Sequence, residues 1–119
     1  MTKKLLYGFL AVYFAFNISS CALVQKPIDA RSGLGDNLKS IEECIRAEDW
    51  ENAKIYLDKS QETWKKIKPY FQVDIDHDYV NDIESDFTKL SGYIDANSKA
   101  ESLGAILLIQ KTWENIGNL

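Results

Sequence analysis

The sequence predicts an all-α protein, an antiparallel bundle of about four helices built as two copies of one helix–turn–helix hairpin and preceded by a signal-peptide helix. Three observations support this fold class. Apolar residues recur at the alternating three- and four-residue spacing of an amphipathic helix, and no segment alternates strictly enough to form a strand. The chain also repeats part of its own pattern, which is typical of a duplicated structural unit.

The N-terminus has the features of a bacterial lipoprotein signal peptide. Lys3 and Lys4 precede an uncharged apolar run over residues 5–18, whose length suits the hydrophobic region of such a peptide. The tetrapeptide ISSC at 18–21 then resembles a lipobox, in which a branched aliphatic residue and two small residues precede a cysteine. We therefore expect Cys21 to receive diacylglycerol, which would anchor the chain in a membrane.

Two modes of membrane attachment are compatible with this segment. Cleavage before Cys21 removes residues 1–20 as a signal peptide and leaves the lipid as the anchor. Alternatively, the segment stays as a transmembrane anchor, since residues 5–25 carry no charge and can cross a core of ~30 Å as a helix. Both place the rest of the chain on the extracytoplasmic face of the cell membrane. We expect residues 21–35 to form the lipid anchor and a flexible tether, and residues 36–119 to form the helical domain.

The first two helices form the first predicted hairpin. The first helix runs from Asp36, a suitable N-cap, to about Ala47, with a competing capping box at 40–43. The second helix opens with Asp49 as its N-cap and is expected to end or kink at Pro69, which lacks a backbone N–H.

The last two helices form the second predicted hairpin. The third runs from about Asp76 to Ile94, and Gly92 weakens its last turn. The fourth begins at Ser98, with Glu101 completing a capping box. The residues expected on the four buried stripes are Leu38, Ile41, Ile45, Trp50, Ala53, Leu57, Ser60, Trp64, Ile67, Phe71, Val80, Ile83, Phe87, Leu90, Ile94, Leu103, Ile106, Leu107, Trp113 and Ile116.

The internal repeat is clearest near the ends of the second and fourth helices. QETWKKI at 61–67 recurs as QKTWENI at 110–116, a shift of 49 residues, and the same shift pairs Leu57 with Ile106. The matched residues are mainly those that a helix buries, so we interpret the pattern as a duplicated hairpin. The alternative interpretation is a chance match between amphipathic helices of similar composition.

The charge balance and the cysteines narrow the range of possible functions. Lys and Arg total 14 against 18 Asp and Glu, and this mild acidity argues against a surface that binds nucleic acid. If Cys21 carries lipid, Cys44 has no disulfide partner within the chain. We expect Cys44 to act as a small buried hydrophobe, with a reactive or intermolecular thiol as the alternative.

Trp64, Trp113 and His77 are the candidates for a partner or ligand surface. Each tryptophan lies on an apolar stripe, so core packing is the alternative to a stacking surface. His77, the single histidine, lacks a nucleophile elbow, and a structural role at a helix start is its simpler interpretation. The chain has no phosphate loop, dinucleotide fingerprint or zinc spacing. We therefore expect no cofactor and no enzymatic activity.

Acidic residues at the start of the third helix form a candidate metal site. Asp78, Asp82 and Asp86 are spaced to share one helix face, where they could collect a divalent cation weakly. The resemblance to a calcium-binding EF-hand loop fails, because Tyr79 and Ser85 stand where Gly and Glu are needed. The alternative is structural, since carboxylates near a helix N-terminus gain ~0.3–1 kcal/mol each from the helix dipole.

The order of several weak motifs over residues 38–117 resembles the family called domain of unknown function 4363 (DUF4363). These motifs are Asp49-Trp50, Trp64, His77-Asp78 leading to Ile83, and Asn115-Ile116. The resemblance implies a small helical protein of Gram-positive, often spore-forming bacteria, with an N-terminal membrane segment or a lipobox. The family has no established activity, so the resemblance implies no reaction.

These observations favour a lipoprotein of the cell envelope. We expect a membrane-tethered helical module that interacts with a protein partner in the envelope. The second hypothesis is a protein of the cell surface that binds a small ligand or a divalent cation, and the third is an uncharacterised enzyme.

Overall fold

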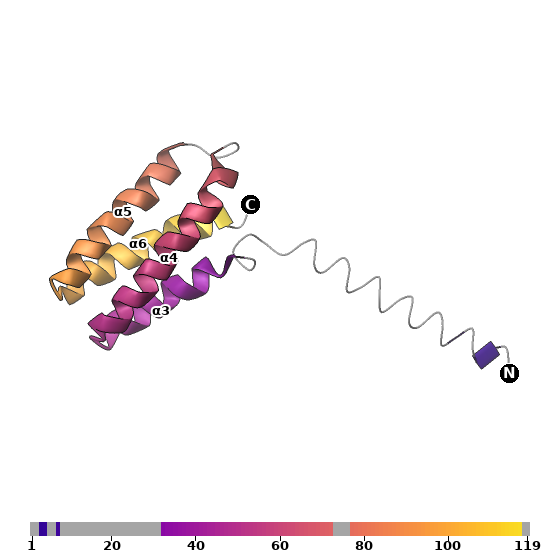
Figure 1. The fold of residues 1–119 in the computed structure, drawn as a ribbon, viewed down its shortest axis with the longest axis horizontal. Helices are drawn as coiled ribbons and strands as arrows, with labels where there is room; N and C mark the ends of the chain where they lie inside the picture. Colours follow the sequence, from indigo (N-terminus) through magenta and orange to yellow (C-terminus); the bar gives the residue numbers. More distant parts are fainter. Residues whose placement is uncertain (1–2, 5–6, 8–31, 73–76, 118–119) are drawn as a thin grey trace.

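Four α-helices make up the domain in the computed structural model (Figure 1). The structure describes residues 3–4, 7, 32–72 and 77–117. The helices are α3 (Leu34–Arg46), α4 (Trp50–Phe71), α5 (His77–Asp95) and α6 (Lys99–Gly117). Within these residues there is no β-strand, so the all-α prediction is confirmed. None of the described helices has both the length and the apolar character needed to cross a bilayer.

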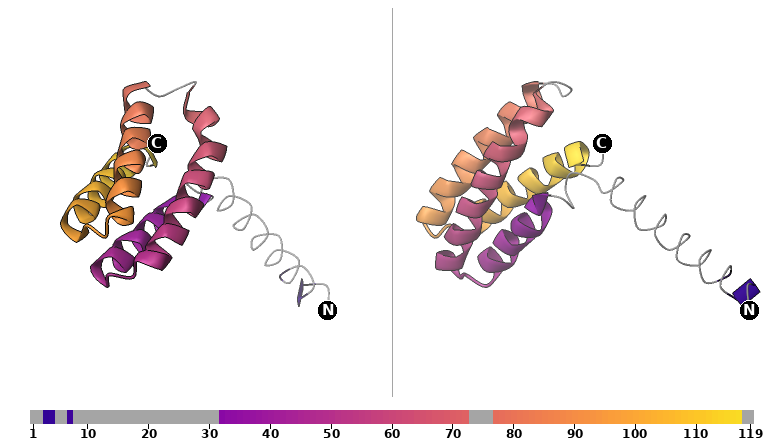
Figure 2. Two further views of the ribbon diagram at one scale, coloured as in Figure 1. Left: turned by 60° about the vertical axis from the view of Figure 1, so that its left-hand side comes forward. Right: turned by 45° about the vertical axis from the view of Figure 1, so that its right-hand side comes forward.

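The helices pack as two antiparallel hairpins, α3–α4 and α5–α6 (Figure 1). The hairpins also contact each other, because α3 packs against α6 and α4 packs against α5 (Figure 2). The turns within both hairpins lie at one end of the bundle, and the start of α3 and the end of α6 lie at the other end (Figure 1).

The two hairpin turns have the same backbone geometry. Glu48 and Asn97, which are 49 residues apart, both adopt the left-handed conformation, with φ of 55° and 54°. Each turn is closed by the long hydrogen bond of a Schellman motif, Asp49 N to Cys44 O at 2.8 Å and Ser98 N to Tyr93 O at 2.9 Å. The 49-residue repeat is therefore present in the backbone as well as in the sequence, which confirms the duplicated hairpin.

The core repeats in the same register. Equivalent residues of the two hairpins are buried at eight pairs of positions: Leu34 and Ile83, Leu38 and Phe87, Ile41 and Leu90, Ile45 and Ile94, Ala53 and Ser102, Leu57 and Ile106, Ser60 and Ile109, and Trp64 and Trp113. Because each hairpin buries one face against the other hairpin, neither half has a complete core by itself.

The first helix begins earlier than predicted. Its N-cap is Gly33, which adopts the left-handed conformation at φ 71° and makes no side-chain cap, whereas Asp36 lies in the first turn. Leu34, in the stretch expected to be tether, is fully buried. The Ser32 hydroxyl accepts a hydrogen bond from Leu34 N at 3.2 Å, and burial of the leucine adds to the stability of this first turn, so the helix extends to it. The competing cap at residues 40–43 lies inside the helix.

Three other predicted features lie at helix ends: the N-cap of α4, the proline near its C-terminus and the capping box at the start of α6. Asp49 caps α4 as predicted, because its carboxylate accepts a hydrogen bond from Asn52 N at 3.3 Å. Pro69 lies in the last turn of α4, which ends soon afterwards. At the start of α6, the Ser98 hydroxyl donates to the carboxylate of Glu101, so the two side chains bond to each other.

Candidate functional site

Both tryptophans named as candidates lie in the core. Trp64 and Trp113 are each 3% exposed. Phe71 joins them, since its ring stacks on Trp64 with centroids 6.1 Å apart and meets Trp113 edge-on at 5.9 Å. This three-ring cluster fills the centre of the bundle at the end away from the hairpin turns. Core packing therefore accounts for both residues.

Two open hollows lie beside these tryptophans, one on each contact between the hairpins. The hollow between α4 and α5 has a volume of about 350 Å³ and is lined by Gln61, Trp64 and Phe87 among others. The hollow between α3 and α6 has a volume of about 370 Å³, and its lining includes Gln110, Trp113 and Leu38 at the equivalent positions. The repeat thus produces two related depressions, which need no separate functional explanation.

A polar network closes the side of the hollow between α4 and α5. The Glu84 carboxylate accepts a hydrogen bond from Trp64 Nε1 at 3.2 Å and forms an ion pair with Lys68. The hydrogen bond from Lys68 lowers the pKa of Glu84, burial opposes this shift, and the bond from Trp64 adds to it. These three polar groups are thus paired with one another.

A second ion pair joins α4 and α5 near the hairpin turns, where Lys54 Nζ lies 2.6 Å from Asp95 Oδ1. Both side chains are more than half exposed, so the pair is worth little by itself. In the matching contact between α3 and α6, Leu103 packs against the core at the position equivalent to Lys54. The two contacts between hairpins are therefore related in geometry but differ in chemistry.

The structure brings together no metal site from the predicted carboxylates. Asp78 and Asp82 are exposed and Asp86 is half-buried. Burial raises the pKa of Asp86, with Lys89 opposing the shift and Asp82 adding to it. In the described part of the chain, no three His, Cys, Asp or Glu side chains gather closely enough to hold a metal ion.

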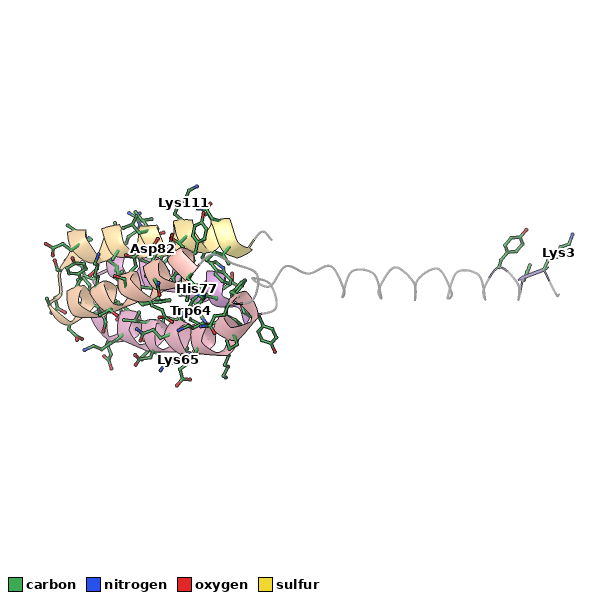
Figure 3. All side chains as sticks on the ribbon, turned by 90° about the horizontal axis from the view of Figure 1, so that it is seen from above. Lys3, Trp64, Lys65, His77, Asp82 and Lys111 are labelled. Carbon is green, nitrogen blue, oxygen red and sulfur yellow. The ribbon has the colours of Figure 1, made fainter. Side chains whose placement is uncertain are left out.

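His77 and Cys44 offer no assembled chemistry within the described residues. His77 is exposed at the first position of α5 (Figure 3). Cys44 is a free, half-buried thiol, and burial raises its pKa, with the charges of Asp49 and Glu43 adding to the shift. A raised pKa keeps the thiol protonated and weakly nucleophilic. The predicted lipidation site, Cys21, lies outside the described residues.

The outer face of α6 carries an apolar surface that the sequence did not predict as exposed. Leu107, which we expected to be buried, is 44% exposed, and Leu108 is 59% exposed. Ala105 and Ile109 are buried in this region of the helix instead. Apolar residues are continuous over 105–109, so their spacing alone does not determine which side faces the core.

The equivalent positions on α4 show that the fold does not require these leucines. A shift of 49 residues places Asp58 and Lys59 where α6 has Leu107 and Leu108. Both α4 residues are exposed, and Lys59 Nζ lies over the Tyr56 ring, 5.2 Å from its centroid. The same backbone position in the same fold is thus occupied by charged residues in one copy and by leucines in the other.

Together these features of the described residues define a small protein of two equivalent helical hairpins, with a closed aromatic core and an exposed apolar surface on α6. The chain belongs to the family described as Domain of unknown function (DUF4363), whose model matches residues 24–119. This confirms the family resemblance, while the lipobox and the Gram-positive origin stay predictions. No curated protein and no solved structure matches the chain.

Proposed function

We propose that the protein is a lipoprotein of the cell envelope whose helical domain binds another protein through the outer face of α6. The observation that carries this proposal is the exposure of Leu107 and Leu108 at positions where α4 has charged residues. Exposed apolar side chains that the fold does not need are typical of a surface that becomes covered in a complex.

Membrane attachment is the second part of the proposal. It is supported by the positive residues, the apolar run and the lipobox that end at Cys21. An anchor restricts the domain to a thin layer next to the bilayer, where the effective concentration of a membrane-bound partner is high. A modest apolar surface is then sufficient for binding.

The proposal includes no enzymatic step and no bound metal or ligand. The polar groups beside Trp64 are paired with one another, and His77 is exposed on the first turn of α5. No observation in the described residues favours the hypothesis of a small-ligand or cation binder over an interaction surface.

Site-specific photocrosslinking in intact cells tests the binding surface. A photoreactive residue at Leu108 of the full chain should give a discrete crosslinked species. The same residue at Ile55, which is 46% exposed on α4, is the matched control and should not. The substitution Leu107→Asp, which introduces the α4 residue, should abolish the crosslink. Equal crosslinking from Leu108 and Ile55 would refute the proposed surface.

Mass spectrometry of the purified N-terminus tests the anchor. We expect a mature chain that begins with a diacylated Cys21. An unmodified, uncleaved N-terminus would contradict lipidation and favour the transmembrane anchor. A Cys21→Ser variant that matures and partitions like the original chain would lead to the same conclusion.

A further inference from the structure

We infer that the partner of the α6 face is a second copy of this chain, docked with the two α6 helices side by side and antiparallel. This inference rests on the proposed function, because it names the partner of the same surface. It is carried by the pattern of shapes and charges along the face, which is complementary to itself in one register.

Six exposed residues make up the α6 face. They are Ala100, Glu101, Gly104, Leu107, Leu108 and Lys111, all exposed in the structure. Their three-, four- and seven-residue spacings place them on one side of the helix. Figure 3 shows Lys111 projecting from α6 away from the other helices. The face is apolar and small in the middle, with one negative and one positive residue at its two ends.

The charges favour an antiparallel pair over a parallel one. Glu101 and Lys111 are ten residues apart, which is about 15 Å along a helix. In an antiparallel pair centred at residue 106, each Glu101 lies opposite Lys111 of the other copy. In a parallel pair in register, each would lie opposite its own like charge. Antiparallel docking therefore makes two attractive ion pairs where parallel docking makes two repulsive ones.

Among the described residues, the partners of these two charged side chains are local ones on α6 or its N-cap. The Ser98 hydroxyl donates to Glu101, and Lys111 Nζ lies 3.9 Å from Glu114 Oε2. The side chains of Lys111 and Glu114 are 72% and 66% exposed, so this contact is easily exchanged for another. Lys111 can thus engage a second molecule by exchanging a weak contact, and the Glu101 carboxylate can accept a further interaction while it keeps its bond from Ser98.

The shape of the face supports the same register. Gly104 and Leu108 also have their midpoint at residue 106, so each leucine lies opposite the glycine of the other copy. Among the described residues, a Cβ atom added to Gly104 would meet nothing within 4 Å, so none of these neighbours requires glycine there. Glycine in a helix interior costs ~1 kcal/mol relative to alanine. The close approach of a leucine from a second helix gives this costly residue a role.

The area of the α6 face sets the expected strength. A stable complex typically buries about 800 Å² on each partner, whereas the central apolar part of this face consists mainly of two leucines. We therefore expect weak association in solution and stronger association between chains that share one membrane.

Charge reversal on the full chain tests the register. Self-association is measured by fluorescence transfer between chains reconstituted in lipid vesicles. Glu101→Lys and Lys111→Glu should each weaken it by about tenfold, because each converts two attractive pairs into two repulsive ones. An equal mixture of the two variants should associate about as well as the original chain, because both pairs become attractive again.

Two matched controls separate the α6 face from general effects. Glu62→Lys changes the charge at the position on α4 equivalent to Lys111 and should leave self-association unchanged. Gly104→Leu should fill the space that Gly104 leaves for Leu108 of the other copy, and should therefore abolish association. Gly92→Leu should leave association unchanged. Gly92 is an exposed glycine on α5 with equally open space around it. Circular dichroism confirms that each variant remains helical.

The outcomes distinguish this inference from the proposed function. Self-association that is indifferent to both charge reversals, or that is not rescued by mixing them, would overturn the antiparallel α6 pair. A crosslink from Leu108 that joins the chain only to a different protein would also overturn it, yet would support the proposed function. No crosslink from Leu108 would remove both.

Discussion

Ser102 is a buried hydroxyl group whose removal should stabilise the domain. Its side chain is fully buried, and its Oγ has no hydrogen-bond partner in the described part of the structure. The equivalent residue of the other hairpin, Ala53, is also fully buried. The repeat thus shows that alanine fits this position of the fold.

The magnitude follows from two gains and one loss. A buried polar group without a partner costs about 1–3 kcal/mol. Alanine is also the better helix former, by roughly 0.5 kcal/mol over serine. A small loss of packing around the missing oxygen opposes these gains. We therefore expect Ser102→Ala to raise the free energy of unfolding by at least about 1 kcal/mol, and each 1 kcal/mol is about 4–8 °C in Tm for a domain of this size.

Ser60→Ala is a matched control for this prediction. Ser60 is fully buried in α4, but its hydroxyl donates to Tyr56 O at 2.8 Å. The same substitution there removes a hydrogen bond worth about 0.5–1.5 kcal/mol and gains the same helix propensity. The control should therefore be neutral or slightly destabilising. Both effects are measured by urea and thermal unfolding of the full chain in detergent. Circular dichroism monitors the loss of helix. A Ser102→Ala variant no more stable than Ser60→Ala would refute the reasoning, because it would show that the Ser102 hydroxyl is satisfied.

Three further predictions concern a turn, the aromatic cluster and a charge. Glu48→Asn should stabilise the domain by up to about 1 kcal/mol in urea unfolding, because Asn97 occupies the same left-handed position in the other turn; a loss of stability would contradict this. Phe71→Ala should lower the free energy of unfolding by about 3–5 kcal/mol in the same measurement. The neighbouring Tyr70 is 75% exposed, so Tyr70→Ala should change it by less than about 0.5 kcal/mol. Similar losses in the two variants would argue against the aromatic cluster. Glu84→Gln should reduce the loss of stability on acidification. The pKa of Glu84 is lowered in the folded state, so its contribution is present above its usual value of 4.5 and is lost as the pH falls through the lowered pKa. Because this carboxylate is 41% exposed, the effect should be below about 1 kcal/mol, and identical pH profiles of the two proteins would contradict the assignment.

The sequence predicted those parts of the fold that depend on helical periodicity. The four helices and the 49-residue repeat follow from the spacing of apolar residues, as does the burial of Trp64 and Trp113. The N-cap at Asp49 follows from local chemistry, since its carboxylate accepts the N–H of Asn52. Such features depend on residues within one turn of each other, so they can be read along the chain.

Other features depend on contacts between helices and were not predictable in this way. Leu34 extends α3 because a neighbouring helix buries it, despite the two flanking glycines that indicated a tether. Glu84 pairs with Trp64 and Lys68 across two helices, and nothing in the spacing of these residues indicates this. Leu107 faces outward because packing of the whole bundle sets the rotation of α6 about its own axis.

The comparison of the two hairpins separates residues that maintain the fold from residues that serve something else. Where the copies agree in chemistry and burial, as at Trp64 and Trp113, packing alone explains the choice. Where both positions are buried and the residues differ, as at Ser102 and its alanine counterpart, the difference should appear as stability. Where both positions are exposed and differ, as at Leu107 and Asp58, stability has little to gain from either residue. An exposed leucine at a position where the other copy has a charged residue, as at Leu107 and Leu108, therefore points to contacts outside the chain, and both leucines lie on one face of α6.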